Sequence, residues 1–321
     1  MSWLYLGHSR PCTKEPWVGA RRRQTPGAGA RLPGVRAGTG YRLRLATGGA
    51  PQIAFDSASQ DIETIRMPSL DTHLIPCLAD NYAVIVHDTE TGQCLLVDAP
   101  DARPIRSFLQ ARGLHLSEIL LTHHHHDHTQ GAAELRSSYG CAITAPEQEV
   151  ARIPALTRAV REGTIEALGL KIDVLEIPGH TAGHIAYHIP DAGLAFVGDT
   201  LFALGCGRMF EGDAQTMYAS LRKIAALPDA TQVFCGHEYT LANARFALSI
   251  EPENAALVAR AAEIEAKRAR GEPTLPTTIA LEKATNPFLR PQSRAIRARL
   301  GMEGMPDWQI FKRLRELKNR A

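Results

Sequence analysis

Short apolar runs alternate with turns and helical stretches along most of the chain. Residues 82–87 and 93–98 are apolar runs joined by a glycine-containing turn, which predicts a β-hairpin. Residues 104–113 and 131–140 have helical periodicity or composition and end in glycine, which predicts two helices. Strands mixed with helices and hairpins are typical of a layered α/β (α+β) domain with a mixed sheet. Further strands are predicted at 118–123, 171–180, 186–190, 194–200 and 232–238.

Beyond residue 238 the pattern changes, and we predict no strand there. Residues 254–271 are rich in alanine and end in glycine, which favours a helix. Residues 307–319 place apolar side chains at helical spacing after Asp307, which we expect to cap this helix. We therefore predict a sheet domain at 67–238 and an all-helical domain at 239–321.

The first 66 residues differ from the rest in composition. They are rich in Arg, Gly, Ala and Pro, and Glu15 is the only acidic residue before position 50. We interpret residues 1–66 as a disordered or spurious N-terminal extension, with Met67 as the working start. The alternative is an organelle transit peptide, because such segments are Arg-rich and acid-poor, but the low serine content weighs against it.

The bulk composition narrows the classes of partner. The 321 residues carry a net charge of +2, so no strong field favours nucleic acid or an anionic membrane. No apolar run reaches the ~20 residues that a membrane helix needs. The six cysteines are scattered without a C-x-x-C pair, which indicates a reducing compartment rather than a disulfide framework. We expect a cytoplasmic monomer.

The strongest chemical signal is the run THHHHDH at residues 122–128. His123 and His125 are two positions apart, so both point to one side if they continue the preceding strand. Asp127 and His128 follow at once, where the chain turns towards the next helix. We interpret the intervening residues, His124 and His126, as bystanders.

Three further residues end predicted strands beside a glycine: His180, Asp199 and His237. Five imidazoles and two carboxylates supply ligands for two divalent metal ions, with positions left open for water. Any one of these histidines alone is more often a surface or core residue than a ligand. The ordered set favours a dinuclear metal site over a chance histidine tract.

The order H-x-H-x-D-H, G-H, Asp, G-H resembles the metallo-β-lactamase superfamily. The resemblance implies an αββα sandwich in which His123, His125 and His180 hold one metal. Asp127, His128 and His237 would hold the other metal, and Asp199 would bridge both. His184, in PGHTAGH, also matches the family pattern, as a residue that supports the ligands rather than binding metal.

Metals held in this way lower the pKa of bound water, so a bridging hydroxide exists at neutral pH. Asp127 would orient that hydroxide as well as bind metal, or would only bind metal. The expected reaction is hydrolysis of an activated acyl group, and a thioester suits it because zinc tolerates a leaving thiolate. Zinc is the expected metal, with iron and manganese as alternatives.

The segments PGHTAGH, GDTLFALGCGRMFEG, CGHEYTLANARFA, EPEN and NPFLR are similar to those of the hydroxyacylglutathione hydrolases (glyoxalase II). This resemblance runs from Met67 to the C-terminus. It implies conversion of S-D-lactoylglutathione and water to D-lactate and glutathione, in methylglyoxal detoxification. The glutathione carboxylates would be bound by the side chains that match family positions, namely Arg208, Tyr239, Arg315 and Lys318.

Two residues depart from the family pattern. Phe210 stands where some relatives carry a tyrosine hydroxyl, and Arg208 stands where others carry lysine, which keeps the charge but changes the geometry. Three rival functions remain open from the sequence: a persulfide dioxygenase-like enzyme with one iron on the same fold, a nuclease or phosphodiesterase, and a metal-binding protein without activity. The near-neutral charge argues against a polyanionic substrate.

Overall fold

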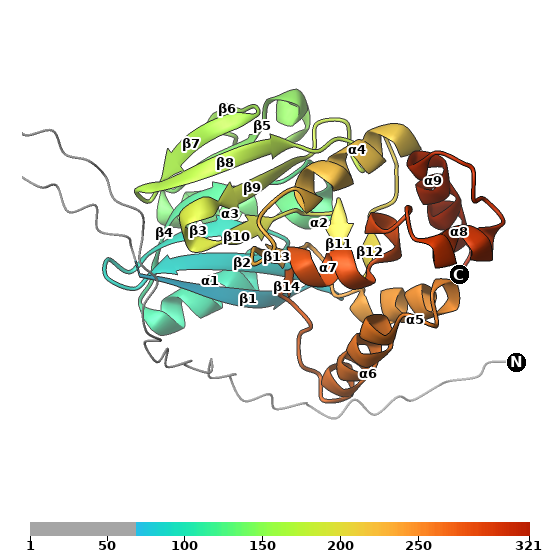
Figure 1. Cartoon of the computed structure of the whole chain (residues 1–321). Helices are drawn as coiled ribbons and strands as arrows, with labels where there is room; N and C mark the ends of the chain where they lie inside the picture. The colour runs from blue at the N-terminus through green and yellow to red at the C-terminus, as the bar shows by residue number, and fades with distance from the viewer. Residues whose placement is uncertain (1–68) are drawn as a thin grey trace, which may run out of the picture. The chain divides into compact units, whose positions relative to one another are not determined.

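Two six-stranded β-sheets form the centre of the fold in the computed structural model, which describes residues 69–321 (Figure 1). The expectations for residues 1–66 and for a start at Met67 lie outside the described residues. In the first sheet the strands follow chain order, and pairing is antiparallel from β1 to β3 and parallel from β3 to β6. The strands are β1 (Leu70–Cys77), β2 (Asn81–Asp88), β3 (Gln93–Val97), β4 (His115–Leu120), β5 (Ala142–Pro146) and β6 (Arg158–Val160).

The second sheet has the order β14-β13-β10-β9-β8-β7. Its pairs are antiparallel except for β10 and β13, so this sheet is mixed as well. A separate two-stranded hairpin, β11 (Leu201–Phe202) with β12 (Gly205–Cys206), follows β10. The remaining strands are β7 (Gly163–Ala167), β8 (Leu170–Glu176), β9 (Ile185–Ile189), β10 (Leu194–Phe196), β13 (Gln232–Phe234) and β14 (Thr277–Thr278).

Alternation along β2 shows how the layers are built. Val84 and Val86 lie in the core between the two sheets, where they meet residues such as Phe196 of the second sheet. Ala83 and Ile85 point to the opposite face and pack with the helices α1 (Ala102–Arg112) and α3 (Ala132–Tyr139). The predicted mixed α/β architecture is confirmed.

The outer face of the second sheet is covered by α4 (Ala214–Ala225). Asp213 caps this helix by accepting a hydrogen bond from the backbone N–H of Thr216 at 2.8 Å. Met217, Leu221 and Ile224 recur at helical spacing and are fully buried against the sheet. The layers are therefore helix, sheet, sheet, helix, which is the αββα sandwich expected from the family resemblance.

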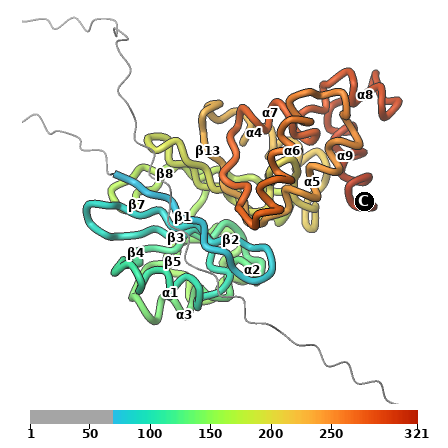
Figure 2. The backbone as a smooth tube through the Cα atoms, turned by 90° about the horizontal axis from the view of Figure 1, so that it is seen from below, coloured from blue at the N-terminus to red at the C-terminus, as the bar shows by residue number. Residues whose placement is uncertain are grey.

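Beyond Tyr239 the described chain is mainly helical, and Figure 2 shows these helices gathered at one end of the two sheets. None of the described helices is long and apolar enough to cross a membrane. The division of the chain into domains at residue 239 stays a prediction. The helices are α5 (Thr240–Ile250), α6 (Ala255–Ala269), α7 (Ile279–Thr285), α8 (Arg294–Leu300) and α9 (Asp307–Lys318).

Two expectations for this region are wrong. β14 is a strand of two residues that pairs with β13, and it is too short for any periodicity to reveal it. The residue that caps α9 is Pro306, not Asp307. The Asp307 carboxylate instead accepts hydrogen bonds from Arg297 and Tyr218, so it joins α9 to α8 and α4.

All five cysteines among the described residues are buried free thiols. Burial raises the pKa of Cys77 and Cys235 to about 12 and that of Cys94 to about 11. Cys206 borders the pocket described below, yet burial raises its pKa too, against the opposing effect of Arg315. The absence of disulfides in the described part of the chain agrees with the expectation from cysteine spacing.

Candidate metal centre and substrate pocket

The predicted ligands lie in loops that leave the C-terminal ends of four strands, not on the strands themselves. Each of these strands ends before its ligand because the chain must turn out of the sheet to bring the side chains together, although His237 still forms an isolated bridge with Asn81. The short helix α2 (His126–Thr129) begins inside the histidine run. Such loop positions at strand ends are where α/β folds build sites. The strands in question end at Leu120, Glu176, Phe196 and Phe234.

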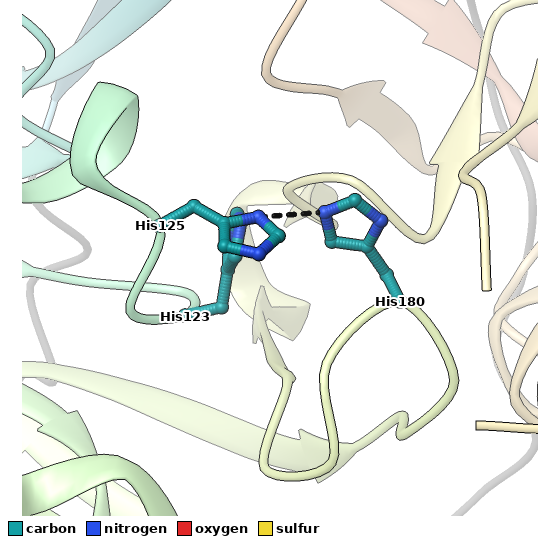
Figure 3. Close-up of side chains that lie close together, drawn as sticks. All are labelled: His123, His125 and His180. Atoms are coloured by element: carbon teal, nitrogen blue, oxygen red, sulfur yellow. Dashed lines mark hydrogen bonds between the residues drawn. The ribbon is translucent and has the colours of Figure 1, made fainter. Parts of the chain in front are cut away.

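Three imidazoles converge in the first ligand group, as Figure 3 shows for His123, His125 and His180. The Nδ1 atom of His125 lies 3.1 Å from His123 Nε2 and 3.0 Å from His180 Nε2. His123 is fully buried and His180 is 4% exposed. Three ring nitrogens that approach one another this closely in a buried site are suited to share one cation.

The second ligand group consists of Asp127, His128 and His237. The Nε2 atoms of His128 and His237 are 3.3 Å apart, and Asp127 Oδ2 lies 3.5 Å from His237 Nε2. Asn81 donates a hydrogen bond to Asp127 Oδ2 at 3.1 Å and so fixes the carboxylate.

Asp199 lies between the two groups. Its Oδ2 is 3.5 Å from His180 Nε2 and 3.3 Å from His237 Nε2, while its Oδ1 is 3.4 Å from His128 Nε2. The Oδ1 atom is buried and has no hydrogen-bond partner among the described residues. A buried carboxylate oxygen without a donor fits a metal ligand. The donor set of nitrogen and carboxylate oxygen therefore fits a dinuclear metal site.

The outward ring nitrogens of the ligands are held by a second set of residues. His128 Nδ1 lies 2.8 Å from Asp98 Oδ2, and His237 Nδ1 lies 2.8 Å from Asp80 Oδ1. His180 Nδ1 lies 2.9 Å from the carbonyl oxygen of Arg208. These acceptors place the proton on Nδ1 and leave each Nε2 lone pair free for a metal.

Sequence reasoning missed these supporting carboxylates. Asp98 ends a predicted strand in the same way as Asp199, so a signal for it was present. Asp80 carries no such signal, because its contact with His237 spans 157 positions of sequence. His184 has the expected supporting role: its Nε2 accepts a hydrogen bond from the backbone N–H of Asp199 at 3.1 Å.

Protonation differs between the two groups. Burial lowers the pKa of His125 to about 4, with a further contribution from His180, and burial also holds the pKa of His123 well below its ordinary value. Burial opposes a charge on His128, but Asp199 and Asp98 raise its pKa to about 9. The first group is thus neutral at pH 7, as metal ligation requires, whereas His128 must release a proton.

Gly236 allows the strand before His237 to approach the centre. A Cβ atom at this position would lie 2.5 Å from His128 Cε1 and 2.6 Å from Asp199 Oδ1. No side chain fits there without displacing a ligand. This close approach explains why the residue before His237 is glycine.

A cavity of about 460 Å³ adjoins both ligand groups. Its walls include all four residues expected to bind substrate, namely Arg208, Tyr239, Arg315 and Lys318. The Tyr239 ring stacks on His237 with 4.7 Å between centroids and planes 5° apart. Tyr239 therefore joins the substrate wall to the second ligand group.

The two basic residues of α9 have different surroundings. Arg315 is only 5% exposed, and its Nη1 donates a hydrogen bond to the carbonyl oxygen of Cys206 at 2.6 Å. Lys318 is half-buried, and its Nζ donates to the carbonyl oxygen of Ala242 at 3.0 Å. Burial lowers the pKa of Lys318. Arg315 is thus part of the pocket framework, while Lys318 lies nearer to solvent.

Phe210 stands over the first ligand group. Its ring meets His180 and His125 edge-on, at centroid distances of 5.2 and 5.7 Å. The side chain is 61% exposed, so it presents an apolar surface to the cavity. His124 contacts Glu149 and Arg152, whereas His126 is exposed; that both are bystanders to metal binding stays a prediction.

Comparison with known proteins adds the family. Residues 76–237 match the metallo-beta-lactamase superfamily, and residues 238–321 match the hydroxyacylglutathione hydrolase C-terminus. The hydroxyacylglutathione hydrolase of Maricaulis maris (strain MCS10) is 50% identical over 254 residues, which cover 79% of this chain and 99% of the relative. The chain belongs to the hydroxyacylglutathione hydrolase family. The family protein of Brucella ovis (strain ATCC 25840 / 63/290 / NCTC 10512) is 52% identical over 244 residues, covering 76% of this chain and 95% of the relative.

Two solved structures share the fold of this hydroxyacylglutathione hydrolase but are less similar to it in sequence than the relatives above. The crystal structure of ETHE1 from Myxococcus xanthus has a TM-score of 0.53 at 25% identity and covers 79% of this chain and 98% of that chain. The BLEG-1 B3 metallo-beta-lactamase has a TM-score of 0.54 at 22% identity and covers 68% of this chain and 100% of that chain. The second likeness shows the sandwich fold alone.

Proposed function

We propose that the protein hydrolyses S-2-hydroxyacylglutathione thioesters, with S-D-lactoylglutathione as the principal substrate and D-lactate and glutathione as products. One observation carries this proposal. Two histidine and aspartate groups joined by Asp199 adjoin a cavity with cationic walls, in a chain that matches nearly the full length of hydroxyacylglutathione hydrolases. The reaction removes an activated glutathione thioester, and the sequence resemblance implies a place in methylglyoxal detoxification.

The proposed ligands follow the two groups: His123, His125 and His180 for one ion, and Asp127, His128 and His237 for the other, with Asp199 shared. Zinc is the proposed metal, and iron or manganese suit the same nitrogen and oxygen donors. When bound, such ions lower the pKa of water to roughly 7. Asp127, fixed by Asn81, orients the attacking water through its Oδ2.

The cavity wall supplies the glutathione contacts. Glutathione carries two carboxylates, which favour charge-assisted hydrogen bonds from cationic side chains. Exposed Arg208 and half-buried Lys318 are placed to donate them, while Arg315 adds positive charge from within the wall. Tyr239 offers its hydroxyl from the ring stacked on His237.

The rival function, a persulfide dioxygenase-like enzyme with one iron, is less well supported. Both ligand groups are complete in this chain, whereas a mononuclear enzyme needs only one. Metal analysis together with a thioester assay separates the two functions. Two ions per chain and thiol release from S-D-lactoylglutathione support the proposal; one iron per chain with oxygen consumption would support the rival.

A charge substitution tests the substrate site. Lys318→Met keeps an unbranched side chain of similar length and removes the ammonium group, whose Nζ lies 5.4 Å from the centroid of the Phe246 ring. A hydrogen bond to a charged group contributes about 1.5–3 kcal/mol, and partial exposure reduces this, so we expect KM to rise about tenfold with kcat little changed. Arg313→Met is the control on the same helix, because Arg313 pairs with Glu316 outside the cavity. An unchanged KM in Lys318→Met would remove Lys318 from the glutathione site.

The cytoplasmic location, the monomeric state and the absence of nucleic-acid or membrane partners remain predictions from the sequence. Sedimentation of the purified protein would test the oligomeric state.

A further inference from the structure

His124 lies between two residues of the first ligand group, yet its side chain faces a different set of partners. Its Nε2 is 2.9 Å from Arg152 Nη1, and its Nδ1 is 3.0 Å from Glu149 Oε2. A guanidinium only donates, so His124 Nε2 accepts and the proton resides on Nδ1. The protonated His124 Nδ1 therefore faces the Glu149 carboxylate, as an ion-pair contact at 3.0 Å.

Glu149 belongs to the short 3-10 helix Glu147–Arg152 and is 3% exposed. Its other oxygen, Oε1, accepts hydrogen bonds from the Thr181 hydroxyl and, at 3.1 Å, from the backbone N–H of Gly183. These two residues lie on either side of Ala182, directly after the ligand His180. One buried carboxylate thus contacts both loops that carry the first ligand group.

The packing between Glu149 and the second loop is tight. A Cβ atom at Gly183 would lie 2.6 Å from Glu149 Cγ, so only glycine lets the loop close onto the carboxylate. The neighbouring Glu211 reinforces the same loop, because it accepts a hydrogen bond from the backbone N–H of Ala182 at 2.8 Å. Arg152 pairs with Glu211 as well as with His124.

We propose that Glu149 is a positioning residue for the first ligand group. It holds the loop of His123 and His125, through His124, at a fixed separation from the loop of His180, through Thr181 and Gly183. The separation matters because His125 Nδ1 and His180 Nε2, which lie 3.0 Å apart, must stay close together for the three imidazoles to share one ion. The inference rests on the proposed metal-dependent function.

Another use of the same residues would be a third metal site, since His124, Glu149 and Glu211 also place ligand atoms close together. Arg152 argues against it. Its guanidinium contacts both His124 and Glu211, and so it occupies the position of the cation and neutralises the carboxylate. The cluster is therefore an internal ion-pair network that braces the two loops.

Glu149→Gln separates the two halves of this link. The amide oxygen can still accept from Thr181 and Gly183, whereas the amide N–H groups face the proton on His124 Nδ1, so only the link to His124 breaks. Glu149→Ala breaks both links. Glu147→Gln is the matched control, because Glu147 lies on the same short helix but pairs with Arg161 at the surface.

The measurement is the affinity of each zinc ion, by competition with a chromophoric chelator in the absence of substrate. Supporting residues around metal ligands typically contribute 10–100-fold to metal affinity. We expect Glu149→Gln to lower the affinity for one of the two zinc ions by about tenfold. Glu149→Ala should lower the affinity for the same ion further, and Glu147→Gln should bind both ions with unchanged affinity. His124→Ala combined with Glu149→Gln should be no weaker than either single variant, since both remove one link.

The outcomes are distinct from a failure of the proposed reaction, because zinc affinity is measured without thioester. If Glu149→Gln binds both zinc ions with the affinity of the unaltered chain, the positioning role is wrong. Equal weakening of both equivalents, or a metal-free protein that no longer unfolds cooperatively, would show general structural damage and would also overturn the proposal. Zinc binding as expected without lactoylglutathione hydrolysis would leave the positioning role standing and remove only the substrate.

Discussion

Asp98 holds His128 in the orientation that a metal ligand needs. Its Oδ2 lies 2.8 Å from His128 Nδ1, and its Oδ1 accepts a hydrogen bond from the backbone N–H of Thr122 at 2.9 Å. Asp98 is 3% exposed and has a positive φ of 56°, a conformation that asparagine also adopts readily. Asp98→Asn therefore changes the hydrogen-bond pattern without straining the backbone.

The direction of the effect follows from the two partners. The backbone N–H of Thr122 is a fixed donor, so the amide oxygen of the new asparagine must face it. The amide nitrogen then faces His128 Nδ1 and drives the imidazole proton to Nε2. A protonated Nε2 cannot bind a metal, and loss of such a supporting contact typically costs 10–100-fold in metal affinity, or about 1.4–2.7 kcal/mol.

The assay is a chelator competition that resolves the two zinc equivalents, with the activity towards lactoylglutathione measured on the same samples. We expect Asp98→Asn to lower the affinity for the zinc ion that His128 binds. We also expect kcat to fall in proportion to the loss of that ion. Asp88→Asn is the control, because Asp88 is also a buried strand-end carboxylate, but its oxygens accept hydrogen bonds from Glu90 and Thr91 rather than from a candidate metal ligand. Unaltered zinc affinity in Asp98→Asn would refute the tautomer argument.

Two further predictions concern stability. Glu282 is fully buried against Arg260, so Glu282→Ala leaves an unpaired buried cation and should cost about 3–5 kcal/mol, seen as a Tm lower by roughly 10 °C; a loss under about 1 kcal/mol would contradict this. Burial opposes ionisation of Glu251, but Arg290 and neighbouring donors lower its pKa, so its stabilisation is present above the ordinary value of 4.5 and lost on acidification. In urea unfolding, Glu251→Gln should be less stable than the unaltered chain at about pH 7, and this deficit should shrink as the pH is lowered below 4.5; a deficit that does not change with pH would argue against ionisation.

The sequence pointed to candidate ligands that the structure brings together, because each follows an apolar strand and most of them stand beside a glycine or another candidate ligand. That local pattern directly reflects how a loop leaves the sheet, as Gly236 and His237 show. The helix α4 has apolar side chains at helical spacing, but it was not among the helices predicted from the sequence. β14 was missed because two residues carry no periodicity.

Other features are not encoded locally. Glu149 meets Gly183 across 34 positions, and nothing in the sequence around either residue indicates the other. Arg315 lines the cavity as expected of a substrate-binding residue, but nothing in the sequence indicated that it is buried and commits one nitrogen to the Cys206 carbonyl. Which face of a helix is covered depends on distant segments, and for this reason a basic residue in a helix does not by itself indicate a free charge.

The buried cysteines have a consequence for an enzyme of the proposed kind. Thiol–disulfide exchange requires a thiolate that a partner can reach. With thiol pKa values of about 11 to 12 at Cys94 and Cys235, and little exposed sulfur, hardly any of these groups ionise at neutral pH. Cys206 borders the cavity into which glutathione would be released, and its own burial keeps it protonated there. The cysteines between residues 69 and 321 are thereby protected from S-glutathionylation by oxidised forms of the product.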